Sequence, residues 1–288
     1  MNSRLLIIDA LGLVYRSFYA IQSLSTAAGR PTNAVYGFIK TLRQLEKVWQ
    51  PTHELVVFDG GSPKERTELW PQYKAQRPPM PDALREQLPG VESFLNAARV
   101  AHVRLVDTEA DDIMASVADQ ASAQGLEALA ATADKDLMQI VGGGVFLVTP
   151  GKAEDRLGPE EVALKTGVRP DQIVEWLALI GDTADNIPGV PGVGPKTATK
   201  WLNEWGSLES LWAHLDALKP EKLRQALQQH RDAVVRNVAL MRLQKDIRIS
   251  HSMDDLKRQP PDERRLLQFY QSMEFHSLAR DLQTPSLL

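Results

Sequence analysis

Two kinds of chemistry stand side by side in the segment GDTADNIPGVPGVGPKTATKW (181–201). Asp182 and Asp185 are three residues apart, and paired carboxylates attract metal ions. A turn rich in glycine and proline follows, and the backbone N–H groups at the start of the next helix attract phosphate. The segment therefore favours a polyanionic substrate that is cut with the help of metal.

More acidic residues stand where predicted strands end. The apolar runs RLLIIDA (4–10), ELVVFDG (54–60) and EALAATAD (127–134) each include an aspartate at their end and predict buried parallel strands. Because parallel strands bring their carboxyl ends to one edge of a sheet, we expect these aspartates to converge there. Together with the clusters TEADDI and TADKD, the expected metal-binding residues are Asp9, Asp59, Glu109, Asp111, Asp112, Asp134, Asp136, Asp182 and Asp185.

So many neighbouring carboxylates require cations. Helix capping would explain EADD (109–112) by itself, but clusters from five places on the chain would repel each other unless cations bind among them. Oxygen ligands, with no cysteine in the chain and no histidine near any cluster, suit Mg²⁺ or Mn²⁺ rather than zinc. Two such ions, typically about 4 Å apart, hold the attacking and leaving oxygens of a phosphodiester. No Ser–His–Asp or Cys–His arrangement suggests a protein nucleophile, so we expect water to attack.

The glycine-rich turn predicts a binding site for duplex DNA. It is no Walker A loop, because Pro195 separates Gly194 from Lys196, and GVPGVG has the wrong spacing for a dinucleotide fingerprint. What remains, over about 173–205, is a helix–hairpin–helix motif, whose N–H groups can hold a phosphate without reading bases. A plain turn between packed helices would explain the glycines but not Lys196 and Lys200, which lie four apart on one helical face.

The remaining pattern predicts two domains. Strands, including HVRLV (102–106) and VFLVTP (145–150), alternate with helices and predict an α/β domain with a mostly parallel sheet over 1–157. Strands then stop, which predicts an all-α module over 158–288. Segment 61–84 fits neither pattern, because it holds five prolines and has no period. A long insertion at the ligand-binding edge of a sheet is expected to be functional.

Composition adds limits. The chain has 288 residues, a net charge of −4 and no cysteine, which excludes disulfides and zinc–thiolate sites. It has no apolar run long enough to span a bilayer and no signal peptide pattern, so we expect a cytoplasmic protein without membrane contact. Basic residues are concentrated locally, with eight Lys/Arg against three Asp/Glu between Lys219 and Arg248.

Several motifs carry a resemblance to a known family. They are LLIIDALGLVYRSFYA, PTNAVYGF, VVFDG, YKAQRPPMP, EADDIMAS, TADKDLMQI, LIGDTADNIPGVPGVGPKTA and MEFHSLARDL. With them the chain resembles, nearly end to end, the 5′ nuclease domain at the N-terminus of bacterial DNA polymerase I, within the flap-endonuclease superfamily. Ala10, Leu11, Gly12 and Ala184 depart from the family pattern without removing a ligand. No polymerase sequence follows, so we expect a stand-alone nuclease or an isolated domain.

The resemblance implies roles for individual residues. Asp9, Asp59 and Glu109/Asp111 would surround one ion and Asp134, Asp136, Asp182 and Asp185 a second, with Asp111 and Asp112 close to both. Residues 61–84 would form a helical arch for a free 5′ end or flap, with Lys74 and Arg77 facing the scissile phosphate as catalytic residues. The expected DNA contacts are Arg16, Tyr73, Lys74, Arg77, Gly192, Gly194, Lys196, Thr197 and Lys200. In similar proteins this turn binds K⁺ through backbone carbonyls, here those of Leu179, Ile180, Pro188, Val190 and Val193.

The predicted function is a metal-dependent, structure-selective 5′→3′ exonuclease and flap endonuclease, monomeric, acting on DNA with a 5′ flap, nick or free 5′ end. Two alternatives remain. A non-catalytic relative that binds DNA junctions would not need all nine acidic residues. A PIN-like ribonuclease uses fewer carboxylates and lacks a helix–hairpin–helix, which GVPGVGPKT (189–197) supplies here.

Overall fold

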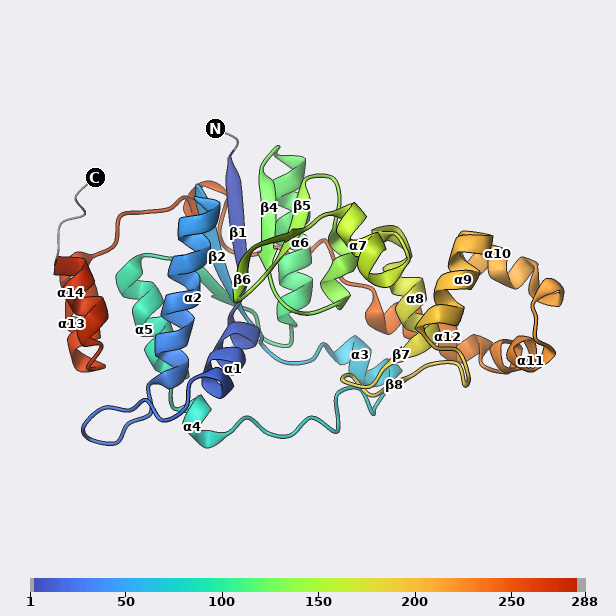
Figure 1. Ribbon diagram of the computed structural model, residues 1–288, viewed down its shortest axis with the longest axis horizontal. Coiled ribbons are helices and arrows are strands. Elements are labelled where there is room, and N and C mark those ends of the chain that lie inside the picture. The colour runs from blue at the N-terminus through green and yellow to red at the C-terminus, as the bar shows by residue number, and fades with distance from the viewer. Residues whose placement is uncertain (1–2, 284–288) are drawn as a thin grey trace.

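The structure is a computed structural model that describes residues 3–283. Figure 1 shows a sheet with flanking helices, and next to it a part that consists mainly of helices. The first elements are β1 (Arg4–Asp9), α1 (Ala10–Ala20), α2 (Asn33–Trp49), β2 (His53–Phe58), α3 (Lys64–Leu69), α4 (Asp82–Arg85), α5 (Leu88–Ala98), β3 (His102–Arg104), α6 (Ala110–Ala123), β4 (Glu127–Ala131), η1 (Asp136–Ile140), β5 (Val145–Thr149) and β6 (Lys152–Leu157). There follow α7 (Pro159–Thr166), η2 (Pro170–Gln172), α8 (Ile173–Ile180), β7 (Gly181–Asp182), β8 (Ile187–Pro188), α9 (Pro195–Trp205), α10 (Leu208–Ala213), η3 (Leu215–Ala217), α11 (Glu221–Gln229), α12 (Arg231–Met241), η4 (Asp254–Leu256), α13 (Glu263–Ser272) and α14 (His276–Gln283).

The main sheet has the order β3-β2-β1-β4-β5-β6 and is parallel from β3 to β5. The side chains of Leu5 to Ile8 in the central strand β1 are fully buried, because helices cover both faces of the sheet. All five predicted strands are present. The acidic residues that end or follow β1, β2 and β4 lie at one edge, as the parallel arrangement predicts.

Strand β6 was not predicted from the sequence. It pairs with β5 in antiparallel fashion at the edge of the sheet, and its charged residues are exposed. An edge strand of this kind lacks the apolar run that reveals a buried strand. The short strands β7 and β8 also contradict the prediction that strands stop after Gly158, although each has only two residues.

Two predicted helical segments differ in the structure. The chain after the arch folds as two helices, α4 and α5, and Pro89 occupies the first turn of α5. Proline is tolerated there because the first N–H groups of a helix have no intrahelical partner. The expected helical arch (61–84) is helical only at its ends, in α3 and α4, and the residues between them form turns and extended chain.

The helical part divides as well. Helices α7 to α12 lie together, whereas α13 and α14 pack beside α5 at the opposite end of the molecule (Figure 1). Leu266, Tyr270 and Met273 join the same apolar core as Phe94. The predicted module 158–288 therefore contributes its last helices to the α/β core, and residues 284–288 lie outside the described residues. Across residues 3–283, none of the helices has the length and apolar character to span a bilayer.

Candidate active site

Asp9 is held at the end of β1 by its position as N-cap of α1. Its side chain accepts a 2.9 Å hydrogen bond from the Gly12 N–H. A Cβ atom on residue 12 would come within 2.2 Å of Asp9 Oδ2, so glycine leaves the carboxylate its place. Burial, and then the charges of Asp134 and Asp59, raise the pKa of Asp9 to about 6.

Asp9 faces other acidic side chains across a cleft of ≈ 450 Å³. Asp59 follows β2, and Asp111 is in the first turn of α6, where burial and the charges of Asp134 and Asp9 raise its pKa. We call the acidic residues that line this cleft the first acid group: Asp9, Asp59, Glu109, Asp111 and Asp134. Lys74 and Arg77 line the same cleft, so residues from five separate segments meet there.

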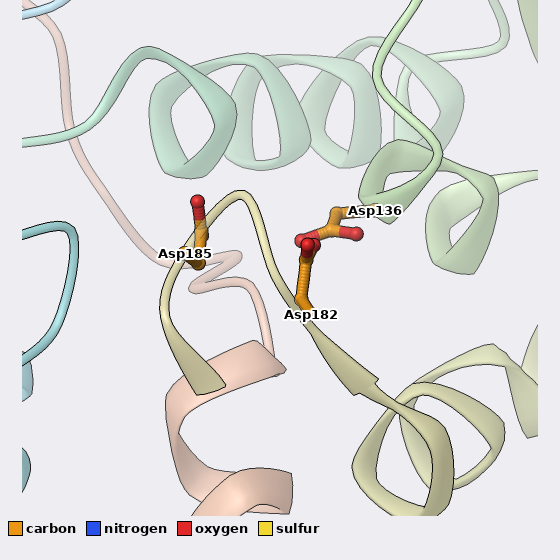
Figure 2. Close-up of side chains that lie close together, drawn as sticks. All are labelled: Asp136, Asp182 and Asp185. Carbon is orange, nitrogen blue, oxygen red and sulfur yellow. The ribbon is translucent and has the colours of Figure 1, made fainter. Parts of the chain in front are cut away.

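A second acid group comprises Asp136, Asp182 and Asp185; in Figure 2 the carboxylates of Asp136 and Asp182 meet, and Asp185 lies beside them. One carboxylate oxygen from each lies within 4.8 Å of the others. Burial, and then the charges of Asp134 and Asp182, raise the pKa of Asp136 to about 8. Oδ1 of Asp136 is buried without a hydrogen-bond partner. These oxygens fit a hard divalent cation, which would replace the missing partner and relieve the repulsion.

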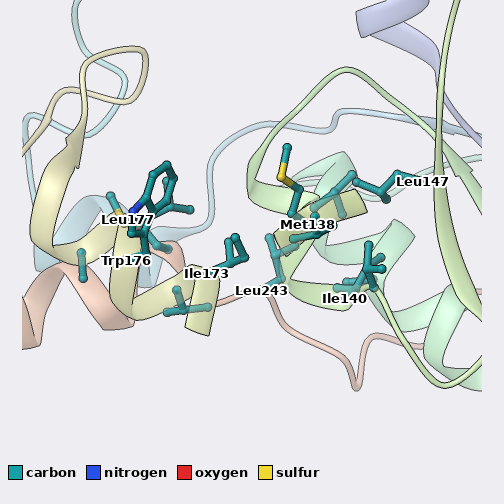
Figure 3. Packing of buried hydrophobic residues seen from close by; sticks show 14 of the residues in the cluster. Met138, Ile140, Leu147, Ile173, Trp176, Leu177 and Leu243 are labelled. Carbon is teal, nitrogen blue, oxygen red and sulfur yellow. The ribbon is translucent and has the colours of Figure 1, made fainter. Parts of the chain in front are cut away.

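Apolar packing holds the two segments that carry the second acid group. Met138 and Ile140 in η1 belong to one buried cluster with Ile173 and Leu177, on the helix that leads to Asp182 (Figure 3). The hairpin β7–β8 is tight: a Cβ atom on Gly181, which has φ 79°, would lie 2.3 Å from the Gly189 nitrogen. The aspartates are thus positioned by rigid elements.

Three basic side chains lie against the acidic ones. Lys74 Nζ is 2.7 Å from Glu109 Oε1 and 3.8 Å from Asp185 Oδ2, and Arg77 Nη2 is 2.5 Å from Asp185 Oδ1. Lys135 Nζ is 3.2 Å from Asp182 Oδ2. Lys74 and Arg77 thus lie beside both acid groups, in position to meet a phosphate bound between them.

Asp112, expected among the metal-binding residues, already has partners within the protein. This side chain is fully buried, and both its oxygens bind the Arg66 guanidinium at 2.7 and 2.8 Å. Oδ1 also accepts from the Gln244 N–H. Because the buried Arg66 already neutralises Asp112, we count it in neither acid group, and its expected metal role stays a prediction. Arg66, which also binds Glu109, was missed because an arginine in an irregular segment gives no sequence signal for a buried partner.

Tyr73, expected to contact DNA, also has a partner within the protein. It is buried, and its hydroxyl group donates to Glu109 Oε2 at 3.0 Å. Its hydroxyl group therefore supports the first acid group. Asp134, assigned by resemblance to the second ion, lines the cleft of the first group and accepts from the Asp136 N–H. It stands between the two groups.

The helix–hairpin–helix is formed by α8, the turn and α9. Gly192, Gly194, Lys196 and Lys200 are exposed, and Thr197 is half-buried at the start of α9. Gly194 is the N-cap of α9, with Pro195 in its first turn. The exposed helix start fits the predicted phosphate site.

Three of the five carbonyl groups expected to bind K⁺ accept the hydrogen bonds given next. Leu179 O accepts from the Val190 N–H, Val190 O from the Val193 N–H, and Pro188 O from the Asn237 side chain. Each carbonyl has a second lone pair, so these bonds leave room for an ion. Arg16 is exposed and lines a second hollow of ≈ 320 Å³ together with Asp9, Asp134 and Pro150.

Comparison with protein families settles the relationship. Residues 4–167 match the model described as 5′-3′ exonuclease, N-terminal resolvase-like domain, and residues 168–264 match 5′-3′ exonuclease, C-terminal SAM fold. The chain belongs to the 5′-3′ exonuclease family. The predicted fold class, a mostly parallel sheet with flanking helices followed by a helical part, is thereby confirmed, and so is the nuclease class.

Individual relatives agree. The 5′-3′ exonuclease of Aquifex aeolicus is 37% identical over 278 residues, which cover 96% of this chain and 94% of that protein. The thermostable DNA polymerase I of Thermus aquaticus is 38% identical over 290 residues, which cover all of this chain and 34% of the polymerase. The chain thus spans about a third of the DNA polymerase I relatives that it matches.

Solved structures share the fold. T5 5′-exonuclease with bound zinc has a TM-score of 0.69 at 23% identity, over 83% of this chain and 89% of that one. The catalytic core of Rad2 in complex with DNA substrate has a TM-score of 0.65 at 16% identity, over the whole of this chain and 93% of that one.

Proposed function

We propose that this 5′-3′ exonuclease family member hydrolyses DNA phosphodiesters as a 5′→3′ exonuclease and 5′-flap endonuclease that depends on divalent metal. The observation that carries the proposal is the cleft in which the first acid group faces Lys74 and Arg77. Carboxylates alone would repel a phosphodiester. Carboxylates that hold cations, with two basic side chains beside them, attract one.

The residues divide into ligands and phosphate-facing groups. Asp9, Asp59, Glu109, Asp111 and Asp134 would hold one ion, and Asp136, Asp182 and Asp185 the other. Mg²⁺ or Mn²⁺ bound there would supply an activated water and stabilise the leaving oxygen. Lys74 and Arg77 would stabilise the negative charge that develops on the phosphate during cleavage.

Glu109 has a second task. Its two oxygens bind Lys74, Arg66 and the Tyr73 hydroxyl group, so that the ammonium group of Lys74 is directed into the cleft. A fixed cation needs little reorganisation when charge develops, which is the main source of electrostatic catalysis.

Binding of the duplex is assigned to the exposed hairpin. The N–H groups at the start of α9, with Lys196, Thr197 and Lys200, would hold a phosphate, and K⁺ would be bound by the carbonyl groups named above. Arg16 would contact the strand near the first acid group. The Rad2 neighbour, which was solved with DNA substrate, supports this mode of use for the fold. We further propose a monomer, and a cytoplasmic location in keeping with the absence of cysteine.

Cleavage assays test the proposal. A 5′-flap duplex, a nicked duplex, a single strand and a matched RNA strand are incubated with and without Mg²⁺. We expect cleavage of the flap in Mg²⁺ and none in EDTA. Binding of the flap without any cleavage would favour the non-catalytic alternative, and preferred cleavage of single-stranded RNA would favour the PIN-like one.

A further inference from the structure

Asn186, directly behind the acidic pair, connects two segments of the active site. Its backbone is left-handed, with φ 58°, a conformation that asparagine tolerates better than most residues. Its side-chain amide donates to the Gln72 carbonyl at 2.8 Å, and its own carbonyl accepts from the Trp70 indole N–H at 2.9 Å. One residue therefore bonds twice to the segment that carries Lys74 and Arg77.

Other hydrogen bonds join the same two segments. The Lys74 N–H donates to the Asp185 carbonyl at 3.0 Å, and the Gln76 side chain donates to the carbonyls of Thr183 and Ala184 at 2.9 and 3.1 Å. Lys74, like Asn186, has a left-handed backbone, with φ 55°. Such conformations persist only where surrounding contacts enforce them, and they gather at functional sites.

Trp70 is held from its other side as well. The Arg236 guanidinium lies 4.0 Å from the centre of the Trp70 ring, which is a cation–π contact. The next residue, Asn237, donates to the carbonyls of Ala178 in α8 and of Pro188 in β8. Helix α12 thus fixes both Trp70 and the hairpin that carries Asp182 and Asp185.

We propose that Asn186 and Trp70 form a clasp that positions Lys74 and Arg77 over the two acid groups, which makes both of them positioning residues for cleavage. The proposal rests on the proposed function. Neither side chain binds a carboxylate, so the clasp acts through the segment 70–77. A displacement of about 1 Å at a catalytic cation is enough to cost up to about a hundredfold in rate.

Two substitutions test the clasp. Trp70→Phe keeps a ring beneath Arg236 and removes the indole N–H. Asn186→Gly keeps the left-handed backbone and removes the amide. Single-turnover cleavage of a saturating 5′-flap duplex in Mg²⁺ should fall about tenfold to a hundredfold in each, with the dissociation constant in Ca²⁺ within about threefold of wild type. The matched control is Trp212→Phe, since Trp212 also lies beside an arginine, Arg231, at 5.3 Å. Its rate should not change.

A double-mutant cycle separates positioning from general destabilisation. In a background that carries both Lys74→Ala and Arg77→Ala, Trp70→Phe should cost less than about twofold, because the two cations that it positions are gone. A full additional loss in that background would overturn the proposal, and so would an unchanged rate for both single variants. If wild type fails to cut in Mg²⁺, the proposed function itself fails. Wild-type cleavage with an additive cycle refutes the clasp alone.

Discussion

The ammonium group of Lys74 lies 2.7 Å from a carboxylate oxygen of Glu109. The same group is 3.8 Å from Asp185, so it lies between the first and the second acid group. A metal ion in either group would compete with Lys74 for these oxygens, and a phosphate between the groups would attract it. Lys74 is therefore placed to exchange a carboxylate for the substrate.

This placement predicts the effect of removing the cation. Lys74→Ala should lower the single-turnover rate by about a hundredfold or more, because a fixed cation acts mainly on charge that develops in the transition state. Affinity for flap DNA in Ca²⁺ should change only a few-fold. Arg77→Ala should behave in the same way, with a smaller loss since its side chain is 51% exposed. The exposed Lys64 on the same segment serves as a control, and Lys64→Ala should cut normally. If affinity alone fell, these residues would only bind DNA.

Asp134 is the acidic residue whose removal should separate catalysis from binding. Its charge raises the pKa of Asp9, of Asp111 and of Asp136, after the larger effect of burial. Asp134→Ala should abolish cleavage in Mg²⁺ and leave binding of flap DNA in Ca²⁺ within a few-fold. In EDTA it should raise the melting temperature by a few degrees, because repulsion among the remaining carboxylates falls. Cleavage at the wild-type rate would refute the assignment of Asp134 to the metal site.

The raised pKa values predict how stability depends on pH without metal. Asp9, at about 6, and Asp136, at about 8, bind protons more tightly in the folded chain than in the unfolded one, where the pKa is near 3.8. Folding stability should therefore fall as pH rises from about 4 through 8. A divalent ion favours the charged carboxylates, so the fall should be smaller in Ca²⁺ than in EDTA.

Melting curves at pH 5, 6, 7 and 8 in both buffers measure this effect. Glu54, which does not line the cleft, has a pKa raised to about 8 by burial and then by the charge of Glu46. Its ionisation therefore adds a fall in folding stability with rising pH that a metal ion does not change. Glu54→Gln removes this component and serves as the control. Equal slopes in Ca²⁺ and EDTA would mean that no ion binds near Asp9 or Asp136.

The Arg66–Asp112 pair predicts a structural effect in place of a catalytic one. Asp112→Asn keeps the size of the side chain and leaves Arg66 without its buried bidentate partner. Breaking such a pair typically costs about 3–5 kcal/mol of folding stability. Urea unfolding should show the loss, while Mn²⁺ affinity at a permissive temperature should stay within a few-fold. A large loss of Mn²⁺ affinity at wild-type stability would restore Asp112 as a ligand.

The sequence predicts this fold well where the chain is buried and regular. The ends of the buried strands could be predicted because their sequences are fully apolar. Asp9 and Asp59 could be placed at one edge of the sheet because parallel strands run in the same direction. The exposed edge strand β6 escaped notice, since its residues KAEDRL read as a loop. The segment 61–84 could not be predicted in detail, because its conformation is set by bonds to Asn186 and Asp185 more than a hundred residues away.

The same limit applies to single side chains. EADD (109–112) contains three acidic residues with similar sequence context, yet the structure gives them three environments. Glu109 binds Lys74 and Arg66, Asp111 faces the cleft, and Asp112 is sealed under Arg66. Helical geometry turns successive residues by about 100°, so neighbouring side chains face different parts of the structure. The partner that each residue meets is set by the position of α3 and of the segment that follows α12. The local sequence does not reveal these positions.

The exposed hairpin yields the last prediction. Lys196 and Lys200 lie on one face of α9, and neither forms an ion pair with a carboxylate among residues 3–283.

 Their ammonium groups are free to meet phosphates of a duplex, with the N–H groups at the start of the helix. Lys196→Ala combined with Lys200→Ala should weaken binding of flap DNA about equally for all sequences. The slope of log K against log salt should fall by up to about two units, since each phosphate contact contributes roughly one. The single-turnover rate at saturating DNA should change little, and Lys165→Ala, on α7, serves as the control for a lost surface charge. An unchanged slope with a collapsed rate would place these lysines at the reaction centre. It would refute the proposal that the acid groups cut while the hairpin holds the duplex.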